Sequence, residues 1–447
     1  MTEVDVLVIG AGMAGLKAAE QLVAKGHSVV VLEAKDRVGG RTKYASVASH
    51  AADLGGQWIG AGHDVLAAEA KRLGIALYPQ YDDGKTTVQL LGRLAQYAGA
   101  LPKMPVLALI ELALLQRRWD RESKTVPPDA PWTAPRAADW DAMTLESWIL
   151  ANLRTKHARE FARIVPRSAW AVEPRQVSYL WFLDALRGAG GLDYLMTVKG
   201  GALEAKLSTG MNAVARGLAA ELGERVVLSA PVSKIVQDAN GVRVTSAKGD
   251  YAARHLIVAI PPGNCARIAF EPPLPAARDG LQQRMPMGAI IKVVAAYKTP
   301  FWRAKGFSGQ VATDDDAIGL VYDDCRDDGT ATLLCFIEGR HAIEWSAKGR
   351  DARRARVTES LVRFFGPEAA DMAAYDDNDW LIEPYTHGYV GSMPPGTMTR
   401  FGHALREPVG RIHWASSETS VEWTGYIEGA LRSGIRAADE VHRSGNA

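Results

Sequence analysis

The segment Asp5-Val6-Leu7-Val8-Ile9-Gly10-Ala11-Gly12-Met13-Ala14-Gly15 decides the fold. Its first half is an apolar run typical of a buried strand, and its second half is a glycine-rich turn that leads into a helical stretch over residues 16–25. The glycines allow a tight turn, a close approach of the backbone to a pyrophosphate, and close packing of the helix, whose N-terminal amides attract phosphate. The segment therefore predicts the opening βαβ unit of a dinucleotide-binding domain.

A second predicted strand, Ser28–Leu32, ends at an acidic residue. This residue, Glu33, lies 23 positions after Gly10 (33 − 10), where a carboxylate can accept hydrogen bonds from ribose hydroxyl groups. Two glycine pairs follow, within Ala34–Thr42 and Asp53–Trp58. Strand, glycine turn, helix, strand and terminal acid together predict a Rossmann-like α/β domain.

The C-terminal part of the chain supplies a second candidate cofactor-binding segment. A strand is predicted over Arg411–Ala415, then a polar turn at Ser416–Thr419, then a helix that opens at Trp423 and continues to about Val441. Small residues such as Gly425 at a helix N-terminus let backbone amides reach an anionic group. This segment therefore predicts a second contact with the same cofactor.

These segments, together with Tyr389–Gly396, resemble the flavin-containing amine oxidase family, and its monoamine oxidase branch in particular. The resemblance runs in patches over the whole chain and is strongest at residues 4–60, 256–302 and 380–441. It implies a glutathione-reductase-like, Rossmann-type FAD-binding domain interleaved with an α+β substrate-binding domain. The implied FAD-binding domain comprises residues 1–78, 205–280 and 384–447, and the implied substrate-binding domain comprises residues 79–204 and 281–383.

The resemblance also implies which residues bind FAD. They are Gly10, Gly12, Met13, Ala14, Gly15, Glu33, Ala34, Arg37, Gly40, Arg41, Thr42, Gly56, Gln57, Trp58, Val232, Trp380, Ser417, Glu418, Gly425, Tyr426 and Ile427. Animal monoamine oxidases carry a cysteine that bonds the flavin, and counting back from Pro394-Pro395-Gly396 places Gly388 at that position. Because glycine has no sulfur, we expect FAD to be bound non-covalently.

Lys292 is the predicted centre of the chemistry. It lies in the strand Gly288–Tyr297, which is otherwise apolar on both faces, so a charge there is costly without a partner. From the residues alone, the alternative is a lysine whose ammonium reaches out to solvent. In the amine oxidases, a lysine in the matching position ahead of Pro300-Phe301-Trp302 holds a water against flavin N5, which implies a catalytic role for Lys292.

Two tyrosines, Tyr389 and Tyr426, match the walls of the aromatic cage in front of the flavin in that family. Two ring faces can attract an amine by cation–π interaction and align its α-carbon, whereas the alternative is that both are core or rim tyrosines. Residues 57–60 do not supply the arginine by which the similar L-amino-acid oxidases bind a carboxylate, and this difference disfavours amino acids as substrates. The implied substrate pocket consists of Gln57, Leu195, Leu320, Tyr322, Tyr389 and Tyr426.

The implied activity is oxidative deamination of an amine. A hydride equivalent passes from the α-carbon to flavin N5, the imine hydrolyses to an aldehyde, and O2 is reduced to hydrogen peroxide. A diamine or polyamine oxidase is an alternative that needs an acidic group deep in the pocket, for which Asp323 and Asp324 are the candidates. A flavin amine dehydrogenase with a protein electron acceptor, and a flavin-binding scaffold without turnover, also stay open. The intact Lys292 and both tyrosines argue against the scaffold.

Composition is consistent with a two-domain enzyme. At 447 residues the chain exceeds what one core serves, and its net charge of +1 gives no reason to expect nucleic acid or an anionic membrane as partner. Three cysteines, Cys265, Cys325 and Cys335, are too scattered for a disulfide framework or a metal site and suit a reducing compartment. With no visible targeting segment we expect a cytoplasmic protein without a membrane anchor. The longest apolar run, Pro105–Leu115, is expected to be a core helix, with contact to a membrane surface beside Arg117 and Arg118 as the alternative. The oligomeric state stays open, with a homodimer as one arrangement.

Overall fold

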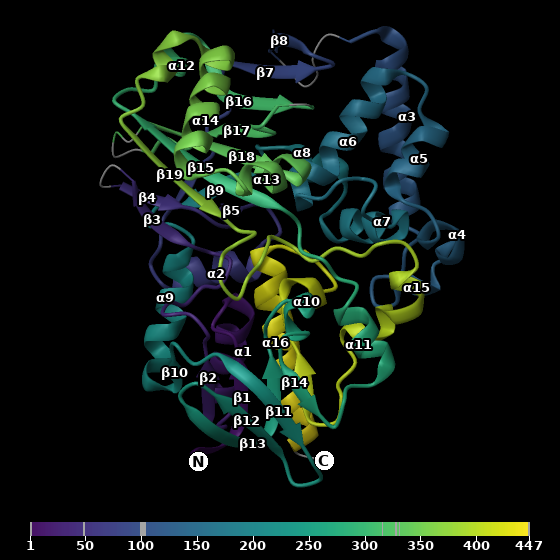
Figure 1. The fold of residues 1–447 in the computed structure, drawn as a ribbon, viewed down its shortest axis with the longest axis vertical. Helices are drawn as coiled ribbons and strands as arrows, with labels where there is room; N and C mark the ends of the chain where they lie inside the picture. Colours follow the sequence, from purple (N-terminus) through teal and green to yellow (C-terminus); the bar gives the residue numbers. More distant parts are fainter. Residues whose placement is uncertain are drawn as a thin grey trace.

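Two large sheets, one in each half of the molecule, organise the fold (Figure 1). The computed structural model describes residues 2–47, 50–98, 104–314, 316–326, 329 and 331–445. The N-terminal strand and the C-terminal helix lie together in the lower half (Figure 1). The predicted mixed α/β class is confirmed.

The lower sheet contains the predicted dinucleotide-binding unit. Its strand order is β10-β2-β1-β13-β12-β11-β14, and β20 pairs with the second half of β13. Strands β10, β2, β1, β13 and β20 run parallel, whereas β12 is antiparallel to both of its neighbours. The carboxyl ends of parallel strands meet at one edge, where such sheets bind dinucleotides. The bounds are β1 Thr2–Ile9, β2 Val29–Leu32, β10 Val226–Val227, β11 Val232–Gln237, β12 Val242–Ser246, β13 Gly249–Val258, β14 Ala269–Glu271 and β20 Ile412–Trp414.

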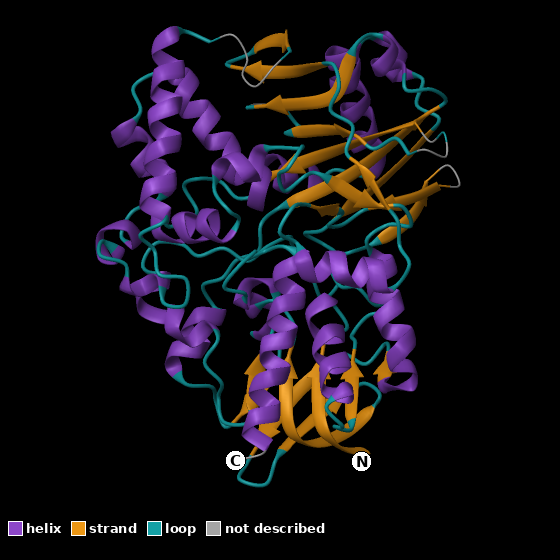
Figure 2. Cartoon of the chain, turned by 180° about the vertical axis from the view of Figure 1, so that it is seen from behind, coloured by secondary structure: helices purple, strands orange, loops and turns teal. Residues whose placement is uncertain are grey.

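Helices cover one face of this sheet (Figure 2). Val6 and Val8 of β1 pack against them, while Leu7 and Ile9 face the opposite side, because side chains alternate along a strand. All four side chains are buried, so this strand is apolar on both faces, as the sequence indicates. The helices are α1 Met13–Ala24, α2 Asp64–Arg72, α9 Asn212–Leu222 and α16 Ile427–Gly445.

The upper sheet is mixed, with the order β19-β15-β18-β17-β16-β7-β8. On β15, the second strand from one edge, Ile291 and Val293 pack toward helix α14, whereas Ile290 and Val294 belong to a cluster that includes Trp380. This second face is the one that carries Lys292 toward the lower half. The bounds are β7 Lys85–Leu90, β8 Arg93–Tyr97, β15 Ile290–Tyr297, β16 Phe307–Thr313, β17 Leu320–Asp323, β18 Ala331–Glu338, β19 Ala374–Asp379, α12 Phe301–Ala304, α13 Gly339–Ser346 and α14 Arg350–Phe365.

A helical region rich in tryptophan packs beside the upper sheet (Figures 1 and 2). Its first helix, α3, differs from the predicted core helix: it buries one face but leaves Val106, Leu107, Ile110 and Leu114 more than half exposed. Within the described part of the chain, no helix has the length and apolar character needed to cross a bilayer. The helices are α3 Val106–Ser123, α4 Ala137–Asp141, α5 Leu145–Asn152, α6 Lys156–Trp170, α7 Tyr179–Gly188 and α8 Leu192–Met196.

Short elements connect the two halves. A three-stranded sheet, β5-β9-β6, lies beside the two-stranded β3-β4, and small helices follow β13 and precede β20. The two large sheets alternate along the chain, which supports the interleaved domain boundaries that we propose from the sequence. The bounds are β3 Tyr44–Val47, β4 His50–Asp53, β5 Trp58–Ile59, β6 Leu77–Pro79, β9 Ala205–Leu207, α10 Pro262–Cys265, α11 Ala276–Gln282 and α15 Thr397–Phe401.

Helix α16 begins later than predicted. It starts at Ile427 rather than at Trp423, because Trp423 (φ 56°) and Gly425 (φ 85°) have left-handed backbone angles that cannot continue into a right-handed helix. A loop therefore precedes the helix and contributes Gly425 and Tyr426 to the wall of a cavity.

Candidate active site

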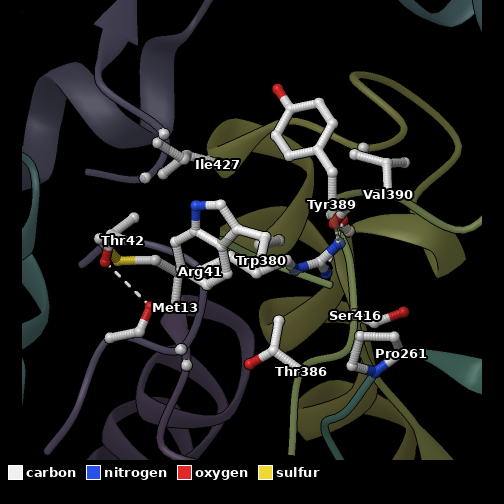
Figure 3. A pocket seen from close by; sticks show the side chains of 18 of the residues that line it. Met13, Arg41, Thr42, Pro261, Trp380, Thr386, Tyr389, Val390, Ser416 and Ile427 are labelled. Carbon is white, nitrogen blue, oxygen red and sulfur yellow. Dashed lines mark hydrogen bonds between the residues drawn. The ribbon is translucent and has the colours of Figure 1, made fainter. Parts of the chain in front are cut away.

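A cavity of about 610 Å³ connects the two halves of the molecule. Its wall runs from Ile9, at the carboxyl end of β1, to Lys292 on β15 and Phe336 on β18. Figure 3 shows side chains from the N-terminal and C-terminal segments, among them Met13 and Tyr389, around the same space. An elongated site bounded by both sheets fits a dinucleotide that ends beside a second ligand.

The glycine turn forms the lower end of the cavity. Gly10 has a φ of +100°, and a Cβ on Gly15 would lie 1.9 Å from the carbonyl oxygen of Gly10, so neither position accommodates a side chain. Among the described residues no side chain caps α1, and Gly12, Met13 and Ala14 line the cavity. The first-turn amides of α1 are therefore free to bind phosphate.

Glu33 lies at the end of β2, as predicted. Its carboxylate accepts hydrogen bonds from the amides of Ala11 (2.7 Å) and Lys35 (2.9 Å), which orient it on the cavity wall. Burial raises the pKa of this carboxyl group, while the two amides act in the opposite direction. A carboxylate held in this way can still accept from ribose hydroxyls, because each oxygen has a second lone pair.

Arg41 lies on the cavity wall and connects three chain segments. Its guanidinium donates to both oxygens of Glu418 (2.6 and 3.0 Å), to Ser417 Oγ (3.1 Å) and to the carbonyl oxygen of Tyr389 (2.7 Å). Figure 3 shows Arg41 beside Trp380 and directed toward the backbone at Tyr389. Burial alone would raise the pKa of Glu418, but Arg41 lowers it below its usual range. This paired charge positions the segment that carries Tyr389.

A second charged cluster lies at the rim. Glu383 accepts from Lys35, Arg37 and Lys43, each at 2.9 Å. Burial would raise the pKa of Glu383, but these cations lower it to about 2. Arg37, an implied FAD ligand, is therefore engaged with Glu383 and does not line the cavity.

Replacing Glu383 by glutamine is expected to lower the free energy of unfolding at pH 7 by about 1–3 kcal/mol, because three clustered cations lose their shared counter-ion. A carboxyl whose folded pKa is depressed stabilises the fold above its unfolded value of about 4.3, and this contribution is lost as pH falls toward 2. Chemical denaturation between pH 7 and pH 3 should show the gap between wild type and variant closing. A gap that stays constant would contradict the assignment.

Lys292 lies on the cavity wall and is 2% exposed. Its Nζ donates to the carbonyl oxygen of Gly55 (2.6 Å) and to Gln57 Oε1 (2.5 Å), so the ammonium turns inward rather than out to solvent. Burial lowers the pKa of Lys292 to about 8, and the carboxylates of Asp53 and Asp324 oppose that shift. An ammonium has three N–H donors, so one remains to hold a water or substrate atom in the cavity.

Behind Lys292 lies a buried polar network that no local sequence pattern indicates. Lys206 pairs with Asp324 at 2.6 Å, and Gln57 Nε2 donates to the same carboxylate at 3.4 Å. Asp53 accepts from the amide of Met211, and burial raises its pKa to about 6. The network orients the amide of Gln57 and, through it, the ammonium of Lys292.

Both predicted cage tyrosines are half-buried on the cavity wall. Tyr389 is held by its neighbours: its amide donates to Gly288 O (2.8 Å) and its carbonyl accepts from Arg41. The ring of Tyr426 packs edge-on against Trp423, with 5.6 Å between centroids. Burial raises the pKa of both hydroxyls, so both rings stay neutral near pH 7. They offer aromatic faces rather than charges to a ligand.

Most implied site residues line this one cavity. Gly15, Arg37 and Glu418 do not, and each acts behind the wall through packing or charge pairing. The residues on the wall are Gly10, Gly12, Met13, Ala14, Glu33, Ala34, Gly40, Arg41, Thr42, Gly56, Gln57, Trp58, Leu195, Val232, Lys292, Leu320, Tyr322, Trp380, Tyr389, Ser417, Gly425, Tyr426 and Ile427.

Asp323 and Asp324 are wrong as candidates for binding a distal ammonium. Asp323 accepts from Trp302 Nε1 (2.8 Å) and from Arg303 (2.7 and 2.8 Å), and Asp324 pairs with Lys206. Neither lines the cavity. The acid that does line its substrate end is Glu338, and a charged residue at the end of the apolar run 331–338 was the signal that could have revealed it.

Comparisons with known proteins agree with this geometry. Residues 13–442 match the family described as flavin containing amine oxidoreductase. A Mycobacterium tuberculosis protein that bears the name flavin-containing monoamine oxidase AofH is 42% identical over 442 residues, covering 98% of this chain and 96% of its own. The bovine amine oxidase [flavin-containing] A is 37% identical over 447 residues, covering 98% of this chain and 84% of its own.

Solved structures of amine oxidases also resemble this chain over nearly its full length. Cyclohexylamine oxidase from Brevibacterium oxydans superposes with a TM-score of 0.95 at 32% identity, covering 99% of this chain and 100% of its own. Putrescine oxidase bound to putrescine superposes with a TM-score of 0.94 at 30% identity, covering 99% of both chains. The predicted recognition is confirmed: the chain belongs to the flavin-containing amine oxidoreductase family, and it is an FAD-dependent enzyme of amine oxidation.

Proposed function

We propose that this enzyme deaminates a primary amine at Lys292, Tyr389 and Tyr426, with FAD held non-covalently and O2 as the electron acceptor. The overall reaction is RCH2NH2 + H2O + O2 → RCHO + NH3 + H2O2. The observation that carries the proposal is that these three side chains line the cavity that begins at the dinucleotide turn. The three free thiols further support the cytoplasm as its compartment.

The residues present fit FAD. The uncapped amides of α1 suit the diphosphate, Glu33 suits a ribose, and the loop before α16 and the first residue of that helix bring Gly425 and Ile427 to the other end of the cavity. A Cβ on Gly40 would lie 3.3 Å from the Cα of Gly12, so the wall is closely built there. When bound, FAD supplies the two-electron acceptor of the reaction.

The chain's own residues bind and orient the amine. The faces of Tyr389 and Tyr426 attract and align it, while Ile290, Leu320 and Phe336 form an apolar wall that excludes bulk water. Lys292 offers its third donor to a water at the reacting end, because Gly55 and Gln57 already occupy the other two.

The test of the activity is anaerobic mixing of the yellow protein with a panel of amines, followed by admission of air. Flavin bleaching by an amine identifies a substrate, and rapid return of colour with one hydrogen peroxide formed per amine identifies an oxidase. Absence of bleaching by every amine would overturn the proposal, and slow recovery in air would indicate a protein electron acceptor.

Non-covalent binding makes a separate prediction. Acid or heat precipitation is expected to release all FAD into the supernatant, because Gly388 (φ 140°) offers no sulfur and a Cβ there would lie 2.4 Å from the Cβ of Met287. The measurement is the absorbance of pellet and supernatant at the flavin maximum. Flavin retained in the washed pellet would contradict it.

A further inference from the structure

The substrate end of the cavity contains one acidic side chain without a partner. Glu338 ends strand β18, is 4% exposed, and lines the cavity. Among the described residues, no group donates a hydrogen bond to its carboxylate and no cation pairs with it. The nearby Arg167 is already engaged, because it donates to Glu173 (2.9 Å) and to the carbonyl oxygen of Asp314 (3.0 Å).

The upper sheet places Glu338 at a defined distance from the reacting end. In the register of β15 and β18, Lys292 lies opposite Phe336 and Ile290 lies opposite Glu338. Glu338 is therefore the diagonal neighbour of Lys292 on the same face, with their Cα atoms roughly 7–8 Å apart. Among the cavity-lining residues of β15, β17 and β18, only these two carry charge.

The fold makes room for the carboxylate. A Cβ on Gly319 would lie 2.5 Å from Glu338 Oε2, so a glycine there lets the carboxylate lie against the backbone. Burial raises the pKa of Glu338 well above its usual range; the positive charge of Arg167 opposes this rise, and the negative charge of Glu173 adds to it. Burial raises the pKa of the Tyr322 and Tyr389 hydroxyls, and a negative charge on Glu338 adds to both rises.

An isolated buried carboxylate is costly unless a cation or donor satisfies it. We propose that Glu338 binds a second basic nitrogen of the substrate, so that the enzyme favours diamines or aminoalkyl amines over monoamines of the same length. This inference rests on the proposed function. One nitrogen lies between Tyr389 and Tyr426 and is oxidised, while the distal ammonium pairs with Glu338 and leaves unchanged.

The experiment compares n-alkylamines with α,ω-diamines of equal chain length in anaerobic flavin reduction. Wild type is expected to favour one diamine length over the matching monoamine by about tenfold or more in kcat/KM, since an ion pair forms only with the diamine. Glu338→Gln, which keeps shape and removes charge, should reduce the diamine value by roughly 10- to 100-fold, mainly through KM. The monoamine value should change by less than about threefold.

Two further variants change the position of the Glu338 carboxylate and keep its charge. Glu338→Asp shortens the side chain by one methylene, so the preferred diamine should become one carbon longer. Gly319→Ala has no backbone conflict, because its φ lies outside the left-handed region, but it displaces the carboxylate and should weaken the diamine preference alone. Glu122→Gln is the matched control, because Glu122 is a buried acid outside the cavity and bonds Tyr179.

Each outcome is decisive. Bleaching by monoamines with no diamine preference, or equal losses for both classes in Glu338→Gln, would overturn this inference and leave the proposed function intact. Preference for hydroxyl-bearing amines over diamines would show that Glu338 acts as a neutral hydrogen-bonding acid and would also overturn it. Failure of every amine to bleach the flavin would remove the proposed function together with this inference. The melting temperatures of all variants will show which losses of activity are due to unfolding.

Discussion

Replacing Lys292 by methionine is expected to slow turnover at least about tenfold, which corresponds to about 1.4 kcal/mol of barrier, while FAD stays bound. Methionine keeps the length and apolar stem of the side chain but removes the ammonium that contacts Gly55 and Gln57. The third N–H donor of the ammonium, which neither Gly55 nor Gln57 occupies, is lost with it. Stopped-flow measurement of flavin reduction by amine and reoxidation by O2 will show which half-reaction slows.

A matched control separates this effect from the general cost of changing a buried lysine. Lys17 is also buried, but it pairs with Glu69 and does not line the cavity. Lys17→Met should therefore lower the melting temperature without slowing either half-reaction of the folded enzyme. If Lys292→Met shows the same pattern as Lys17→Met, Lys292 has a structural role only.

Alanine at Tyr389 or Tyr426 is expected to reduce kcat/KM heavily, by about 100-fold, because the amine loses an aromatic face and its alignment. Phenylalanine keeps the face and should cost less than about tenfold. The two rings are half-buried, so truncation will also lower stability, and both quantities must be measured on the same samples.

The alternative role makes the opposite prediction for the same variants. If the rings only fill the core, alanine lowers the melting temperature and leaves flavin reduction in the folded fraction unchanged. A pair of alanine variants with normal reduction rates would defeat the aromatic cage and weaken the case for an amine bound between the rings. Tyr375→Phe is a suitable control, since Tyr375 bonds Asp377 outside the cavity.

Much of the fold is predictable from the sequence because short segments determine the conformation of several elements. The strands β1 and β15 are apolar on both faces, and the glycine turn after Ile9 admits few other structures, so the sequence alone identifies them. The start of α16 was misplaced because Trp423, an unusual residue for left-handed backbone, gives no local signal. Backbone angles of that kind are imposed by tertiary packing.

The sequence predicts the site residues whose role depends on one side chain alone. It does not predict those whose role depends on pairing with residues far away in the sequence. Lys292 stands out as a charge in an apolar strand, and Glu338 at the end of β18 gives a similar but weaker signal. The pairing of Lys206 with Asp324 joins positions 118 residues apart, and such pairings are invisible to local patterns. The prediction that Asp323 or Asp324 binds a distal ammonium is wrong because adjacency in the sequence does not determine which cation pairs with each carboxylate.

The hydrogen bonds that Arg41 makes to the C-terminal part of the chain bear on when the protein can bind its cofactor during synthesis. Its partners, Tyr389 and Glu418, are translated more than 300 residues later, and α16 completes the lower half later still. A nascent chain that ends before Ile427 lacks part of the cavity wall, however well its first βαβ unit has formed. We therefore expect FAD capture to be a late step of biogenesis, after the C-terminal segment has been synthesised.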